Sequence, residues 1–170
     1  MMNKALRSSW SKFRHIISEI DDGDTPVIIY QYIRDWYQKN NKVFSPHLIK
    51  QDGIDELINI DVKFYPLEHS KCTPQDMRRF LSPELVPSRE SIMVMFLQEI
   101  LWEIVVLTVE VQCQNCGKLE MSALFDTEAK TIFLECTQCG CIQTADGQPY
   151  NSLKTFRLAQ NDDLKMAGLI

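Results

Sequence analysis

The chain has 170 residues, 45% of them hydrophobic and 24% charged, which excludes a disordered chain and predicts one that buries its own core. The formal net charge of −5 makes nucleic acid an unlikely partner, because phosphate contacts need a basic face, and the longest Lys/Arg run is the pair Arg78 and Arg79. The first twenty residues lack an unbroken apolar core, which excludes a secretory signal peptide and favours a cytoplasmic location.

The first predicted element is an amphipathic helix over residues 3–20. Its apolar side chains recur at intervals of four and three residues, which places them on one face of a helix. They are Leu6, Trp10, Phe13, Ile17 and Ile20. The Asp-Asp-Gly-Asp run at 21–24 is expected to end this helix.

Ser-Pro and Thr-Pro pairs predict where the next helices begin. A Ser or Thr N-cap followed by a proline at the first helical position is a common helix start. The pairs begin at Thr25, Ser45, Thr73 and Ser82. The first three predict helices over 27–39, over 46–52 and over 75–81. Ser88 is expected to cap a longer helix over 89–103.

The most apolar stretch of the chain, residues 92–107, overlaps this last helix. Glu99 and Glu103 interrupt it, and burying two carboxylates in lipid is expensive. We therefore expect no membrane span.

Two further segments alternate apolar and polar residues with period two, which predicts strands. One covers 57–65, with Ile58, Ile60, Val62 and Phe64 on one face, and the other covers 105–112, with Val105, Leu107, Val109 and Val111. The N-terminal 110 residues are therefore expected to be mainly helical, with one or two strands.

The cysteines are the most informative residues of the chain. Cys113 and Cys116, then Cys136 and Cys139, form two Cys-x-x-Cys-Gly knuckles with 19 residues between them, a spacing typical of zinc sites. Two intervening residues let a tight turn aim both sulfurs at one ion, and the glycine that follows permits a left-handed backbone. We expect these four cysteines to hold one structural Zn²⁺.

The segment between the knuckles predicts a β-hairpin. Residues 119–125 and 131–135 alternate with period two around a polar turn at 126–130, and residues 142–145 form a candidate third strand. Residues 112–147 thus resemble a zinc ribbon. The resemblance implies a three-stranded sheet with zinc at one end.

These elements predict an α+β fold. We expect a mainly helical part over residues 1–110, packed on a zinc-ribbon-like module with a C-terminal tail over residues 111–170. Because no Gly/Ser linker separates the two parts, one compact unit is expected.

Other roles for the cysteines were weighed. A zinc-gated redox switch stays open, whereas a catalytic zinc site is disfavoured because no His-Glu-x-x-His motif or His-x-Glu motif occurs. Cys141 is either a small residue beginning a strand or an exchangeable ligand. Cys72 is expected to be a buried or half-buried thiol. The roles of both cysteines stay open.

The functional hypothesis is based on the negative charge of the chain. The hairpin is acidic, and four thiolates around Zn²⁺ would take the net charge from −5 to about −7. We therefore expect a non-enzymatic protein that binds a basic partner protein. In size and acidity the chain is similar to immunity proteins that neutralise bacterial toxins, many of them basic nucleases. A zinc-ribbon protein associated with transcription or RNA is the alternative, and an enzyme with an unrecognised pocket is the third hypothesis.

Overall fold

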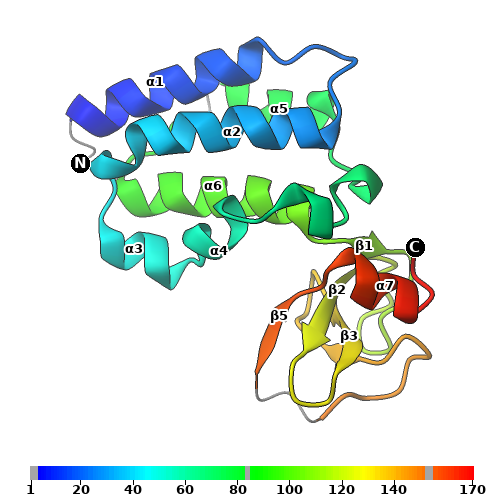
Figure 1. The fold of residues 1–170 in the computed structure, drawn as a ribbon. Helices are drawn as coiled ribbons and strands as arrows, with labels where there is room; N and C mark the ends of the chain where they lie inside the picture. Colours follow the sequence, from blue (N-terminus) through cyan, green and yellow to red (C-terminus); the bar gives the residue numbers. More distant parts are fainter. Residues whose placement is uncertain (1–3, 83–84, 152–154) are drawn as a thin grey trace. The chain divides into compact units, whose positions relative to one another are not determined.

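The computed structural model describes residues 4–82, 85–151 and 155–170. The chain forms two compact units. The helical unit comprises Met1–Ile60 and Lys71–Ile104, and the ribbon unit comprises Asp61–Ser70 and Val105–Ile170. Helices build the first unit and an antiparallel sheet lies in the second (Figure 1). The predicted α+β class is confirmed.

Three long helices and three short ones build the helical unit. They are α1 (Lys4–Ser18), α2 (Pro26–Asn40), α3 (Pro46–Gln51), α4 (Ile54–Ile58), α5 (Pro74–Arg78) and α6 (Glu90–Val105), with 3₁₀ turns η1 (Asn41–Val43) and η4 (Arg79–Leu81). Over the described part of the chain, no helix combines the length and the apolar character needed to cross a bilayer.

The predicted apolar face of α1 lies in the core of the helical unit. Four of the five predicted side chains lie in α1, the fifth, Ile20, follows its end, and all five are at most 4% exposed. Trp10 stacks on Phe13 with ring centroids 5.1 Å apart and reaches Phe96 of α6 at 5.9 Å. Phe13 contacts Trp36 of α2 at 4.8 Å. Aromatic packing therefore ties α1 to both other long helices.

The first three Ser-Pro and Thr-Pro pairs begin helices as predicted, but their caps differ. The Thr25 hydroxyl accepts from the Ile28 N–H, and Thr73 forms a reciprocal capping box with Asp76. Ser45 begins α3 without a side-chain cap; its backbone N–H donates to Glu90. Residue 83 of the fourth pair lies outside the described residues.

The predicted strand over 57–65 is wrong. Ile54, Leu57 and Ile58 are buried at helical spacing in α4, which begins at Gly53 with φ +63°. Residues Val62–Phe64 form the 3₁₀ turn η2, and Phe64 is 54% exposed. The apolar residues of 57–65 therefore do not share one buried face. No strand occurs among the described residues of the helical unit.

The predicted strand over 105–112 is shorter than expected. Helix α6 continues to Val105, and only Thr108–Val109 form a strand, β1. Thr108 pairs with Ser122 and Val109 with Met121. Val105, which suggested the start of a strand, ends a buried helix instead, because period alone does not separate the two states over a short apolar run.

The predicted hairpin is present in the ribbon unit. Strands β2 (Met121–Asp126) and β3 (Thr131–Cys136) pair antiparallel, and β4 (Ile142–Gln143) adds to β3 as the expected third strand. Two strands lie on the other side of β2: β1, and β5 (Phe156–Leu158), which the sequence analysis missed together with helix α7 (Asn161–Met166). A run of three residues is too short for period-two alternation to show.

Candidate metal centre

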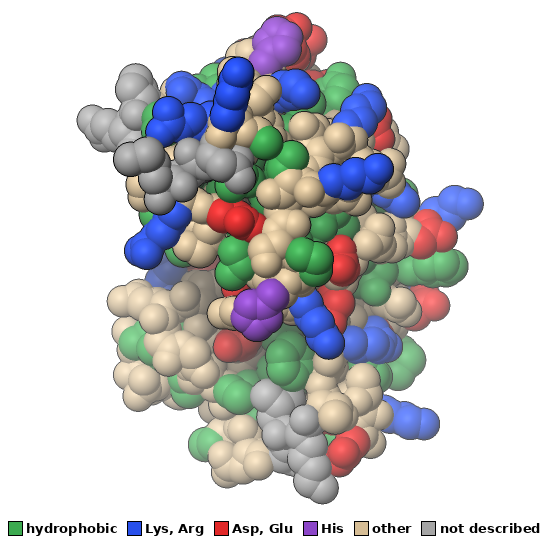
Figure 2. All heavy atoms as spheres, turned by 90° about the vertical axis from the view of Figure 1, so that its left-hand side faces the viewer, with side chains coloured by type: hydrophobic (Ala, Val, Ile, Leu, Met, Phe, Trp, Pro, Cys, Tyr) green, Lys and Arg blue, Asp and Glu red, His purple; other side chains and the backbone are tan. Residues whose placement is uncertain are grey.

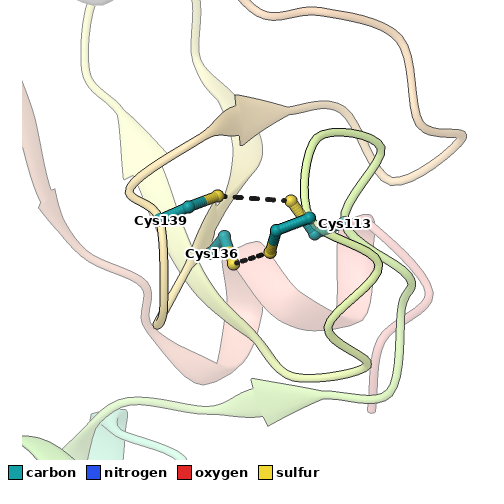
Figure 3. Close-up of side chains that lie close together, drawn as sticks. Cys113, Cys136 and Cys139 are labelled. Carbon is teal, nitrogen blue, oxygen red and sulfur yellow. Dashed lines mark hydrogen bonds between the residues drawn. The ribbon is translucent and has the colours of Figure 1, made fainter.

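The sulfurs of Cys113, Cys116, Cys136 and Cys139 converge in the ribbon unit. All four Sγ atoms lie within 4.8 Å of one another. The sulfurs of Cys113 and Cys139 are 3.6 Å apart, and those of Cys116 and Cys136 are 3.5 Å apart. Figure 3 shows Cys113, Cys136 and Cys139 with their sulfurs facing a common centre. These distances far exceed the roughly 2.05 Å of a disulfide. They lie near the ~3.8 Å expected between the corners of a tetrahedron with metal–sulfur bonds of ~2.3 Å.

The glycine of each knuckle makes the turn possible. Gly117 has φ +76° and Gly140 has φ +67°, in the left-handed region that glycine adopts without a steric penalty. The N–H of Gly117 donates to the carbonyl of Cys113 at 2.9 Å, and Gly140 donates to Cys136 at 3.0 Å. The two knuckles therefore share one backbone conformation.

A second pair of hydrogen bonds identifies the place of Cys141. The N–H of Cys113 donates to the carbonyl of Lys118 at 2.8 Å, and the N–H of Cys136 donates to the carbonyl of Cys141 at 2.9 Å. Cys141 thus occupies in the second knuckle the position that Lys118 occupies in the first. Its contribution to the turn comes from its backbone, which any residue supplies, and its sulfur lies outside the four-sulfur group.

Donors around the sulfurs favour the thiolate form of two cysteines. The Asn115 side chain and the N–H of Cys141 lower the pKa of the Cys139 thiol to about 6. The N–H groups of Cys116 and Asn115 lower the pKa of Cys113. Thiolates are the species that bind metals, so these donors prepare the cluster for a cation.

Cys116 shows how a cation would suit four sulfurs at this distance. The N–H of Lys118 lowers its pKa, but local desolvation and hydrogen bonding with the other three sulfurs outweigh that donor and raise the pKa of Cys116 to about 12. Neighbouring thiols cannot all lose their protons while their negative charges face one another. A divalent ion at the centre removes that obstacle, and the all-sulfur donor set suits a soft or borderline metal.

The cluster lies partly in the core and partly at the surface of the ribbon unit. Cys113 and Cys136, the first cysteine of each knuckle, are 1% and 2% exposed and pack with Met121 and Leu134. The second cysteines, Cys116 and Cys139, are exposed. A metal bound here would connect the sheet core to the surface turns and could enter from solvent.

Gln143 is a site residue that the sequence analysis missed. Its side chain is 1% exposed. Its Nε2 donates to the carbonyl of Gln112 at 3.0 Å, and its Oε1 accepts from the N–H of Gln114 at 3.0 Å. Strand β4, which follows the second knuckle, therefore holds the first knuckle in place. No sequence motif indicates this role, because Gln143 stands in a predicted strand among residues of no special pattern.

The remaining cysteine, Cys72, belongs to the helical unit. It is 7% exposed, and burial, with the carboxylates of Glu103 and Asp76, raises its pKa to about 12. It is a neutral, buried thiol, as the sequence analysis expected.

No protein-family model matches the chain, and no curated protein or solved structure matches it. The likeness of the ribbon unit to a zinc ribbon is carried by the cysteine geometry and the antiparallel strands.

Proposed function

We propose that this protein is a non-enzymatic, zinc-stabilised protein that binds a partner protein. The convergence of four sulfurs within 4.8 Å carries the zinc part of the proposal. Four cysteine ligands complete the tetrahedral shell of Zn²⁺ and leave no position open for a substrate, which is the pattern of structural rather than catalytic zinc.

The ion would join segments that are distant in the sequence. Cys113 and Cys116 follow β1, whereas Cys136 ends β3 and Cys139 precedes β4. One bound ion would therefore hold the chain that enters the sheet against the turn between its later strands. Because this linkage exists only in the folded state, the free energy of metal binding would add to the stability of the ribbon unit.

Native mass spectrometry tests the zinc assignment. We expect one zinc per chain in protein purified without chelators, and release of the zinc on acidification, because protons compete for the thiolates. The control is protein with Cys139→Ser, which should carry no zinc. Purified wild-type protein that holds no metal, and that takes up none when zinc is added, would overturn the assignment.

The charge of the chain supports a basic partner. Residues 19–170 hold 14 basic and 23 acidic residues, a formal charge of −9 before any metal is bound. An acidic surface attracts a basic protein and speeds its association. We therefore propose an immunity or antitoxin role, in which the protein binds and neutralises a basic bacterial toxin such as a nuclease.

Calorimetry with the purified toxin encoded beside the gene tests the role. We expect a one-to-one complex whose association slows as salt rises, together with loss of toxin activity. Absence of both the complex and the inhibition would overturn the role. Salt-sensitive binding to DNA or RNA instead would favour the zinc-ribbon protein associated with transcription or RNA.

A further inference from the structure

One face of α1 lines an open groove of about 590 Å³ in the helical unit. Arg7, Trp10, Ser11 and Arg14 lie along the helix side of the groove, and Leu81 and Val86 lie on the other side. This groove is separate from the four-sulfur cluster, which belongs to the ribbon unit.

The groove carries positive charge on an otherwise acidic chain. Residues 1–18 hold four Lys and Arg residues and no Asp or Glu. Figure 2 shows Lys and Arg side chains gathered on the part of the surface that belongs to the helical unit. None of the described lining residues is acidic. The groove would therefore attract an anion, although the chain as a whole is negative.

The two arginines are placed to contact an extended ligand. They are seven residues apart on α1, which is about two turns and ~10.5 Å along the helix axis. Arg14 is oriented by a hydrogen bond from its guanidinium to the carbonyl of Leu81. Arg7 is exposed, and among the described residues no carboxylate pairs with either arginine. His15, which also lines the groove, already lies 3.8 Å from Glu19.

Trp10 is an apolar residue of α1 that lines the groove. Its side chain is 4% exposed, and its Nε1–H has no hydrogen-bond acceptor among the described residues. Packing against Phe13 and Phe96 holds the ring in place. The Nε1 atom is itself buried, so a ligand in the groove would contact the surface of the ring and not this N–H.

We propose that the groove binds an extended acidic peptide segment of a partner protein. Carboxylates of the segment pair with Arg7 and Arg14, and an apolar side chain of the segment covers Val86, which is 52% exposed. Single-stranded nucleic acid fits less well, because its bases stack on exposed aromatic rings, and among the described lining residues Trp10 is buried and His15 lies against Glu19.

Fluorescence anisotropy on the full chain tests the proposal. The probe is a labelled peptide of alternating glutamate and leucine, and the control peptide carries glutamine in place of glutamate. The matched variants are Arg7→Glu and Lys12→Glu, which make the same charge change on exposed positions of α1, with only Arg7 in the groove. We expect Arg7→Glu to weaken binding about tenfold, and Lys12→Glu to weaken it about twofold at most.

Three outcomes would overturn the proposal. They are equal loss of affinity in both variants, equal binding of the glutamine peptide, and tighter binding of a single-stranded oligothymidine than of the acidic peptide. Nuclear magnetic resonance supplies a second measurement. The acidic peptide should shift the Trp10 indole N–H signal, assigned with Trp10→Phe, in the wild type but not in Arg7→Glu, and an unmoved signal on peptide binding contradicts the site.

This inference and the proposed function can fail separately. Arg7→Glu changes neither the cysteines nor the acidic residues, so it should still bind one zinc and the basic partner. An acidic peptide that fails to bind would remove the groove site and leave those two measurements intact.

Discussion

Gln143 accepts a hydrogen bond from the backbone N–H of Gln114, inside the first cysteine knuckle, at 3.0 Å. The same side chain donates to the carbonyl of Gln112. A buried amide thus satisfies one backbone donor and one backbone acceptor in a turn that has no neighbouring strand to pair with. The position of Cys113 and Cys116 relative to the second knuckle therefore depends on a residue that does not touch the metal centre.

Replacing Gln143 by Ala should weaken the metal centre. The substitution leaves the carbonyl of Gln112 and the N–H of Gln114 without their partner, at a cost of about 2–3 kcal/mol in the stability of the ribbon unit. Zinc affinity should fall by about 10- to 100-fold, as is typical when a residue that orients a ligand is lost. Chelator competition and urea denaturation measure the two effects. Gln138→Ala, at an exposed position of the second knuckle, is the control, and equal effects of the two variants would show that Gln143 holds nothing in place.

Substitution by serine should have opposite effects on zinc binding at Cys139 and at Cys141. Cys139→Ser removes one of the four converging sulfurs and should abolish zinc binding, with loss of several kcal/mol of stability in the ribbon unit. Cys141→Ser keeps the backbone N–H and carbonyl that close the knuckle and should retain one zinc per chain. Native mass spectrometry measures both. Loss of the metal in Cys141→Ser would show that the ligand set is wrong.

Thr73 and Ser45 provide a test of helix capping within one sequence pattern. Thr73→Ala breaks a capping box with Asp76 and should destabilise the helical unit by about 1 kcal/mol. Ser45→Ala removes no side-chain cap, because Ser45 is hydrogen bonded through its backbone N–H and carbonyl, which alanine keeps, and should change stability by less than about 0.5 kcal/mol. Urea denaturation followed by helical circular dichroism compares them. A larger loss from Ser45→Ala would contradict the capping assignment.

Cys72 should make the helical unit sensitive to alkali. Its pKa is raised from 9.0 to about 12, chiefly by burial, so above pH 9 the unfolded chain loses this proton while the folded chain keeps it. Because the unfolded state then binds fewer protons, stability falls as the pH rises from about 9 toward 12.

Urea denaturation of the helical unit at about pH 8 and about pH 10, under reducing conditions, measures this loss. Cys72→Ala should reduce the difference between the two pH values. The pKa of Tyr37 is raised from 10.0 to about 12 by burial and by Asp55. Because its ordinary pKa is higher than that of Cys72, Tyr37 adds to the alkaline loss of stability mainly at higher pH than Cys72 does. An unchanged pH dependence in Cys72→Ala would mean that another group controls the alkaline loss.

The positions of most helices and of the β-hairpin could be predicted from local sequence. The apolar spacing of α1 and the Thr-Pro start of α2 depend on residues within a few positions of one another. The alternation over 57–65 wrongly predicted a strand. It too is a local pattern, and a local pattern does not show which face of a segment is covered by neighbouring elements. Phe64 is exposed, whereas Ile54 and Leu57 are buried in α4.

The sequence by itself determined the α+β class and the four cysteines that could share an ion, since knuckle spacing and glycine conformation are local properties of the chain. Only the tertiary structure decided that β5 pairs with β2, that Gln143 holds the first knuckle, and that Arg7 and Arg14 share a groove with Val86. Each of these depends on contacts between segments far apart in the sequence. Burial removes water as a hydrogen-bond partner, so buried polar groups bond to other groups of the protein, including groups far away in the sequence.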